Sequence, residues 1–327
     1  MDEIIADYIN QIELGPLQEY KGMSVFPLYN SGYDFNYITL KEALEANLLT
    51  VTEIDESGSV PELKVINNAD VPVLLLDGEE LEGAKQNRVL NTTILLKQKS
   101  ETVIPVSCTE QGRWSYHSRE FGESGYLAEF LLRRTKSSSV NESLKTRGEF
   151  RSNQSAVWDE IEKVIRKTNV NSNTRAMRDV YQIKSKDLDK YLESFPPSNK
   201  QKGLLVMING IVMGLDLLSS EKAYHLLHQK LLKSYAMEAM LTEDEGNEKL
   251  DEKEQAQKFL DIACLALDEK HKSIGYGCDH RLEGPSIIGS SLTYQDQVIH
   301  TALFNKDYAK MIKYQITGND AVINSNH

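Results

Sequence analysis

The segment VPVLLLDGEELEGAKQNRVLNTTILL, residues 71–96, decides which fold class the first third of the chain indicates. Two apolar runs, rich in the Val, Ile and Leu that buried strands favour, flank a crossing crowded with carboxylates, amides and cations. A plain hairpin needs only two turn residues with solvated neighbours. The segment between the two apolar runs is therefore either an ordinary surface turn or part of a ligand-binding site.

Strand signals continue on both sides of this segment. Between about residues 21 and 114, short runs of Val, Ile, Leu and Thr alternate with turn residues, and a single helix at about residues 39–46 interrupts them. Such a succession favours an antiparallel β-sandwich or a jelly-roll-like pair of sheets over a parallel, doubly wound sheet.

The middle of the chain shows helical spacing of apolar residues. Two helices are expected behind candidate N-caps at Ser155 and Ser185, whereas the polar stretch at residues 135–155 is expected to be a loop. After it, apolar runs flank Asn209 and Gly210, the strongest short hairpin signal. A helix at about residues 221–240, a second that includes Leu267, and turn-punctuated strands complete the chain.

The expected fold class is therefore α+β, with antiparallel β-sandwich or jelly-roll-like sheets at both ends of the chain and a helical middle section. Residues 1–124 form a β-rich section that carries the polar strand-end motifs, and residues 125–200 form the helical section. Residues 201–327 supply the hairpin, two helices and the C-terminal strands, and we expect them to form one compact unit with the first section.

Composition narrows the function classes. The 327 residues are 40% hydrophobic and 26% charged, with a net charge of -12 and a pI near 5.2. That balance excludes a general nucleic-acid binder, which needs a basic face. The start has no secretory signal, no apolar run approaches the roughly 20 residues of a membrane span, and three cysteines are too scattered for a disulfide framework. We therefore expect a cytoplasmic protein that binds no membrane.

Arg88 is the first candidate for ligand binding. If residues 88–96 form one strand, Arg88 lies on the same face as Leu90 and Ile94, which is the inward face. A buried arginine must be paired or must bind an anion. The alternative to a ligand is a structural salt bridge to one of three nearby carboxylates, Glu79, Glu80 or Glu82.

A second polar cluster ends the next strand, in IPVSCTEQGRW, residues 104–114. Trp114 has the ring to stack a base, and Arg113 the guanidinium to hold a phosphate or carboxylate with two hydrogen bonds. The alternative is a buried tryptophan that anchors a loop beside an Arg–Glu pair. The strands of Arg88 and Cys108 are expected to be neighbours, because only a short connection separates them, and this would bring the two clusters together.

Cysteine and histidine chemistry has weaker signals. Cys108 is expected to be a small buried apolar residue rather than a nucleophile. His225 and His228 are expected on the solvent side of a helix, and no metal cluster is visible. The candidates for an acid–base histidine are His280, in a glycine-bounded loop, and His300, in an apolar strand, where a hydrogen-bonded core histidine is the alternative.

Several motifs together resemble a known family. LLLDGEELEGAKQNRVLNTTIL, IPVSCTEQGRW, FGESGY, GLLVMINGIVMGLDL and DQVIHTALF occur in the order found in the prokaryotic ARG and rhodanese-phosphatase-superfamily-associated protein domain family. The family name records association with ADP-ribosylglycohydrolases and rhodanese-like phosphatases. The resemblance therefore implies a place in the metabolism of NAD-derived or ADP-ribosylated molecules. It implies no cofactor and supplies no catalytic residue.

Two hypotheses follow. In the first, an enzyme or sensor binds an NAD-derived or ADP-ribose-type nucleotide, or an ADP-ribosylated partner, with arginine and lysine gripping a pyrophosphate, and in an enzyme a glutamate would support a ribosyl centre or activate water. In the second, the protein is a non-catalytic binding or scaffold protein accessory to an ADP-ribose-related pathway. The ligand-binding candidates are Lys85, Gln86, Asn87, Arg88, Arg113 and Trp114, and the catalytic candidates are Glu80 and Glu110.

Overall fold

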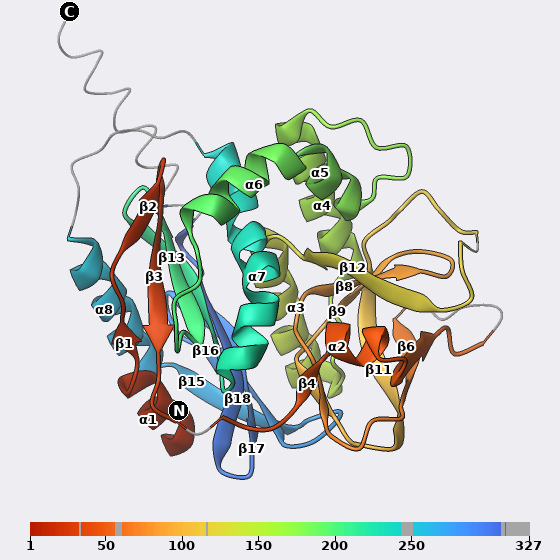
Figure 1. Ribbon diagram of the computed structural model, residues 1–327, viewed down its shortest axis with the longest axis horizontal. Coiled ribbons are helices and arrows are strands. Elements are labelled where there is room, and N and C mark those ends of the chain that lie inside the picture. The colour runs from red at the N-terminus through yellow and green to blue at the C-terminus, as the bar shows by residue number, and fades with distance from the viewer. Residues whose placement is uncertain (33, 56–60, 116, 243–250, 309–310, 312–327) are drawn as a thin grey trace, which may run out of the picture.

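The computed structural model describes residues 1–32, 34–55, 61–115, 117–242, 251–308 and 311. Strands near both ends of the chain build antiparallel sheets, and helices occupy the middle, so the α+β class is confirmed (Figure 1). The helices are α1 (Glu3–Asn10), α2 (Leu40–Glu45), α3 (Phe130–Arg147), α4 (Gln154–Thr168), α5 (Met177–Ile183), α6 (Ser185–Ser194), α7 (Glu221–Leu241) and α8 (Glu252–Cys264).

The largest sheet joins strands from the start and the end of the chain. In this sheet β3 pairs with β13, so a strand near the start of the chain is hydrogen-bonded to a hairpin some 180 residues later. In spatial order its strands are β1 (Glu13–Leu14), β3 (Met23–Tyr29), β13 (Gly203–Ile208), β14 (Ile211–Leu218), β18 (Gln297–Asn305), β17 (Ile287–Tyr294), β16 (Cys278–Glu283) and β15 (Leu267–Lys272), and β2 (Gln18–Tyr20) also pairs with β3.

The hairpin at the centre of this sheet is the one expected from the sequence. Asn209 and Gly210 join β13 to β14 with φ angles of 48° and 75°. Both residues lie in the left-handed region that a two-residue type I′ turn requires, and asparagine and glycine adopt it at the least cost.

Both faces of the large sheet are apolar and covered by helices. Along β13, Leu204 and Val206 face one core cluster, which includes side chains of α3 and α7. The alternate residues Leu205 and Met207 face a second cluster, with α1 and α8. Figure 1 shows α7 between the large sheet and the remaining strands. The two-residue period of a strand therefore builds two cores at once.

Two smaller sheets carry the segment of residues 71–96. The six-stranded sheet has the order β12 (Phe121–Leu127), β8 (Glu79–Gly83), β9 (Arg88–Leu90), β11 (Ser100–Cys108), β6 (Glu62–Asn67) and β5 (Leu49–Thr52). The three-stranded sheet has the order β10 (Ile94–Leu96), β7 (Val73–Leu75) and β4 (Ile38–Thr39).

Residues 88–96 are two strands in different sheets, so the single strand assumed from the sequence is wrong. The reason lies in the three buried polar residues between β9 and β10. Asn91 donates to Phe150 O, the Thr92 hydroxyl to Asp279, and Thr93 Oγ1 lies 2.8 Å from His300 Nδ1. Because these partners belong to three separate elements, the chain leaves the ladder to reach them.

The stretch expected to be a loop, residues 135–155, contains most of the 18-residue helix α3. The buried face of this helix mixes apolar residues with polar ones, and Arg133, Lys136, Ser137 and Asn141 are turned inward. Helix assignment from sequence relies on apolar periodicity, which such a mixed face does not produce. The helix ends at Gly148, whose φ of 70° is the left-handed C-cap.

Other boundaries differ more modestly from expectation. The cap of α4 is Asn153, not Ser155, and α6 begins at Ser185 behind Lys184, which makes no side-chain cap. The helix expected to include Leu267 ends at Cys264; Leu267 instead opens β15 and is 79% exposed. No helix in the described ranges is long and apolar enough to cross a membrane.

A buried ion-pair network ties α3 to the sheets. Arg133 donates to both carboxylate oxygens of Asp216 on β14, at 2.9 and 2.6 Å, and Tyr235 of α7 donates to Oδ2 of the same carboxylate at 2.8 Å. One turn along α3, Lys136 forms an ion pair with Asp77, which follows β7. The helix is therefore held between two sheets by buried ion pairs as well as by the apolar side chains that it adds to the core.

His300 completes the network as a hydrogen-bonded core histidine. Thr93 Oγ1 accepts from the Asp77 backbone N–H and lies 2.8 Å from His300 Nδ1. His300 Nε2 lies 3.2 Å from Asp216 Oδ1 on the other side of the ring. Burial alone would raise the pKa of Asp216, but Arg133 outweighs it, with His300 contributing, and the net pKa lies well below its usual range.

Removing the charge of Asp216 tests how much the fold depends on this network. Asp216→Asn keeps the shape but leaves Arg133 buried without its counter-ion, which typically costs about 3 to 5 kcal/mol. We expect a loss of that size in the free energy of unfolding from urea denaturation. The control is Arg166→Ala, which breaks an exposed helical pair with Glu162 and should cost under about 0.5 kcal/mol. Equal losses in the two variants would contradict this account.

Candidate functional site

The strands of Arg88 and Cys108 are neighbours, as expected. β9 pairs antiparallel with β11, and Cys108 lies directly opposite Arg88. The two polar clusters consequently meet at one end of the six-stranded sheet. Whether the two clusters bind a ligand stays a prediction. The contacts within each cluster show which of its polar groups could still contact a ligand.

Arg88 is completely buried, at 0% exposure. Its Nη1 donates to the main-chain and side-chain oxygens of Gln86, both at 3.2 Å, and its Nη2 lies 3.5 Å from a carboxylate oxygen of Glu53. The acidic partner is thus Glu53, not one of the three carboxylates considered from the sequence. Of those, Glu79 instead forms an ion pair with Lys230 of α7, at 2.7 Å.

Glu110 and Arg113 form a hydrogen-bond network with their neighbours. Arg113 Nε donates to Glu110 Oε2 at 2.9 Å, and its other nitrogens reach Ala84 O at 2.8 Å and Asn87 Oδ1 at 3.1 Å. Gln86 donates to the main-chain oxygen of Glu110 at 2.8 Å. These side chains hold the turn after β11 against the turn after β8.

Trp114 and Lys85 form the exposed part of the predicted cluster. The ring of Trp114 is 50% exposed, and Lys85 Nζ lies 5.5 Å from its centre. A half-exposed ring is not the buried loop anchor considered as an alternative. Its remaining face is available for stacking.

Glu80 has an unusual environment for a carboxyl group. It has no exposed surface, and Thr109 donates to its Oε1 at 2.6 Å. Burial raises the pKa of Glu80 to about 7, although the Thr109 hydrogen bond opposes the shift. Burial also raises the pKa of Cys108 to about 11, so its thiol stays protonated at neutral pH and is a poor nucleophile.

The histidines hold structural positions. His228, expected to face solvent, is buried and bonds to the Tyr224 hydroxyl and Phe195 O, both at 2.8 Å; that expectation is wrong, because α7 is covered on more sides than its apolar spacing indicated. His280 lies in β16, not in a loop, with Nδ1 3.0 Å from Asp268.

One group of residues in the described part of the chain has the donor types of a metal site. It consists of Asp2, Asp268 and His280. Their atoms are already engaged, because the Asp2 main chain donates to Asp268 at 2.8 Å and Lys270 lies 3.3 Å from the Asp2 carboxylate. The group is accounted for as a hydrogen-bonded anchor of the N-terminus.

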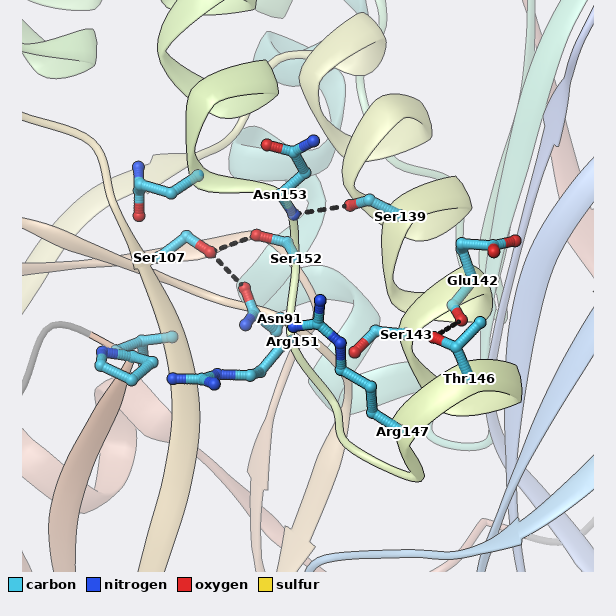
Figure 2. A pocket seen from close by; sticks show the side chains of 13 residues that line it. Asn91, Ser107, Ser139, Glu142, Ser143, Thr146, Arg147, Arg151, Ser152 and Asn153 are labelled. Carbon is cyan, nitrogen blue, oxygen red and sulfur yellow. Dashed lines mark hydrogen bonds between the residues drawn. The ribbon is translucent and has the colours of Figure 1, made fainter.

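A polar pocket of about 550 Å³ lies on the other face of β11, between that strand and the α3–α4 hairpin. Figure 2 shows Ser107 of β11 on one side and the hydroxyl side chains of α3 on the other. Its lining is mostly hydroxyl, amide and guanidinium groups: Pro61, Asn91, Val106, Ser107, Ser139, Glu142, Ser143, Thr146, Arg147, Arg151, Ser152, Asn153 and Gln154.

Strand alternation separates this pocket from the predicted cluster. Ser107 and Cys108 are successive residues of β11 and point to opposite faces, so Cys108 contacts Gln86 while Ser107 faces the pocket. β6 pairs with β11 only as far as Pro105. Beyond it, the side chain of Gln154 accepts from the Cys108 N–H at 2.8 Å and donates to Cys108 O at 2.9 Å, which fixes the start of α4 against the strand.

Two arginines bring positive charge to the pocket. Figure 2 shows Arg147 reaching from the end of α3 toward Ser152 and Asn91. Within the described residues, no carboxylate pairs with Arg147, and the nearest acidic contact of Arg151 is Glu149, at 3.5 Å. The one acidic lining residue, Glu142, turns its carboxylate away from Ser107 (Figure 2).

Sequence reasoning missed the pocket because most of its lining comes from the stretch assigned to a loop. A usable signal was present. Residues 135–155 carry four cations against two carboxylates, among many hydroxyl and amide side chains, in a chain of net charge -12. Such a local reversal of charge indicates where an acidic protein can hold an anion.

A comparison against protein families finds a match over most of the chain. The model of the ARG and Rhodanese-Phosphatase-superfamily-associated Protein domain matches residues 11–304, and the chain belongs to this family. Comparison with curated proteins and with solved structures gave no match.

The raised pKa of Glu80 predicts a pH dependence of stability. Between its ordinary value of 4.5 and the folded-state value of about 7, the folded protein keeps a proton that the unfolded chain has released. The contribution of Glu80 to the free energy of unfolding is complete below pH 4.5 and declines as the pH rises through 7. Across this range the free energy of unfolding of the wild type should fall more steeply than that of Glu80→Gln, by up to about 3 kcal/mol.

Urea denaturation at several pH values measures this difference. Glu101→Gln, which alters an exposed carboxylate paired with Lys64, serves as the control and should keep the wild-type slope. If Glu80→Gln also keeps that slope, Glu80 is ionised in the folded protein and the argument fails.

Proposed function

We propose that this protein binds an NAD-derived or ADP-ribose-type nucleotide in the pocket between β11 and the α3–α4 hairpin. The observation that carries the proposal is Arg147, a guanidinium that points into the pocket and pairs with no carboxylate in the described part of the chain. In a chain of net charge -12, an arginine left without a counter-ion beside a cavity favours an anionic ligand.

Three further features support an anionic, hydroxyl-bearing ligand. The volume of about 550 Å³ lies within the usual range for small-molecule sites. Ser152, Asn153 and Gln154 stand at the N-terminal end of the 15-residue helix α4, where the helix dipole favours negative charge. The hydroxyl and amide side chains of the lining match the hydroxyl groups of ribose. The association recorded in the family name points to the same ligand class.

The pocket favours a binding or sensing role over turnover. General acid–base chemistry on a ribosyl group needs a carboxyl within hydrogen-bond reach. Glu142 turns away, and the catalytic candidates Glu80 and Glu110 belong to the cluster behind β11, where both are buried and bonded to Thr109 and Arg113 respectively.

The surface of Lys85 and Trp114 is a second candidate location for the same ligand. A half-exposed indole with a lysine above it can stack a base and attract a phosphate. Both side chains are on the surface, so Trp114→Ala and Lys85→Ala should fold normally and test this location directly.

The decisive measurement is the melting temperature with and without ADP-ribose or NAD. A ligand at about 100 times its dissociation constant adds roughly 2.7 kcal/mol to the free energy of unfolding, which is several degrees. Arg147→Ala removes charge-assisted hydrogen bonds and should weaken binding about ten- to a hundredfold while leaving the unliganded melting temperature unchanged.

Arg166→Ala, at an exposed position of α4 away from the pocket, is the matched control and should bind as the wild type does. Loss of binding in Trp114→Ala but not in Arg147→Ala would move the site to the other face of β11. No shift with either nucleotide would reject the proposed ligand class.

A further inference from the structure

The hydrogen bonds in the pocket fix the direction of its hydroxyl groups. Asn91 donates through its amide nitrogen to Phe150 O at 3.1 Å, so its Oδ1 faces Ser107, which donates to it at 2.8 Å. A serine hydroxyl has one proton, so Ser107 can only accept from its other neighbour, Ser152. The chain of donation therefore runs from Ser152 through Ser107 to Asn91.

The Ser152 hydroxyl therefore donates its proton to Ser107 and has only lone pairs for a ligand. Ser107 and Asn91 are buried and hold this direction in place, since reversing it would leave the Asn91 oxygen unsatisfied. A ligand atom that meets Ser152 must itself carry a hydrogen. An oxygen of a fully ionised phosphate ester does not, whereas a sugar hydroxyl does.

The arginines have the opposite property. Arg147 and Arg151 present only donors, which suit a phosphate. Figure 2 shows Arg147 reaching toward the Ser152 side of the pocket. The guanidinium donors and the Ser152 acceptor can therefore contact the same ligand. The pocket thus combines a place for an anion with a place for a hydroxyl donor.

The lining has no aromatic side chain on which a base could stack. Within the residues described, no Phe, Tyr, Trp or His borders the pocket, and its wholly apolar side chains are Pro61 and Val106. Recognition of adenine in proteins generally uses an aromatic or broad apolar surface, or a guanidinium plane, for the π-face. The two guanidinium groups of this lining are the ones assigned to the phosphate, so the pocket offers a base less than it offers a sugar phosphate.

We infer that the pocket recognises the phosphoribosyl end of its ligand, a sugar hydroxyl at Ser152 and a phosphate at Arg147 and Arg151, and leaves the base outside. This rests on the proposed function and narrows it to one chemical group. The ligand class is a sugar phosphate, of which ribose 5-phosphate is the smallest member related to ADP-ribose.

Isothermal titration calorimetry with ADP-ribose, ribose 5-phosphate, ADP and adenosine tests this. We expect ADP-ribose and ribose 5-phosphate to bind with dissociation constants within about tenfold of each other, ADP to bind at least about tenfold more weakly, and adenosine not to bind. ADP also contains a ribose with a 5′-phosphate, but that ribose carries adenine at C1′, so ADP tests whether the pocket requires a ribose without a base.

The outcomes distinguish the inference from the proposed function. If ADP-ribose and ADP bind equally and ribose 5-phosphate does not, the function stands and the inference is overturned. If ribose 5-phosphate binds and ADP-ribose does not, the inference stands and the nucleotide function falls. If no compound binds, both are rejected.

Ser152→Ala probes the hydroxyl acceptor separately from the arginines. It should weaken ribose 5-phosphate about tenfold and leave the weak binding of sulfate, an anion without a hydrogen to donate, unchanged, whereas Arg147→Ala should weaken both. Ser155→Ala, at an exposed first-turn position of α4 outside the lining, is the control and should change neither. Equal effects of Ser152→Ala on the two anions would contradict the assigned direction of donation.

Discussion

The buried pair between Arg133 and Asp216 is the interaction on which the rest of the structure depends. It fixes the long helix α3 against β14, and Lys136 fixes the same helix to Asp77 beside the smaller sheets. Apolar contacts allow a helix to shift along its neighbour. Two buried ion pairs, in contrast, keep their geometry at only one position of the helix. The far end of α3 forms a wall of the polar pocket, so the position of Arg147 follows from bonds made three to four turns earlier.

β11 determines which polar groups can act together. Side chains on its two faces serve two different environments, the packed cluster around Arg88 and the open pocket beside Ser107. In the packed cluster, the cations lie beside carboxylates: Arg88 forms an ion pair with Glu53, and Arg113 with Glu110. In the pocket, Arg147 pairs with no carboxylate of the described residues. This difference in pairing, rather than the number of charges, is why the pocket carries the proposed function.

Much of the fold could be predicted from local sequence. The strand runs follow the two-residue period, Asn209 and Gly210 meet the backbone requirement of a tight turn, and the proximity of Arg88 and Cys108 followed from a short connection. Prediction failed where burial is polar. Residues 91–93 left their strand to satisfy hydrogen bonds, and α3 was missed because charged and polar side chains share its buried face with the apolar ones.

By itself, the sequence determined the α+β class, the places of many strands along the chain, the acidic charge balance and the motifs of the family, because each depends on residues near one another in the chain. Tertiary structure alone decided the pocket. Its lining comes from the region of Pro61, from Asn91, from β11 and from the α3–α4 hairpin, which meet only after the sheets and α3 are packed. Whether an arginine is free or paired is a property of that packing, since a counter-ion can come from any part of the chain.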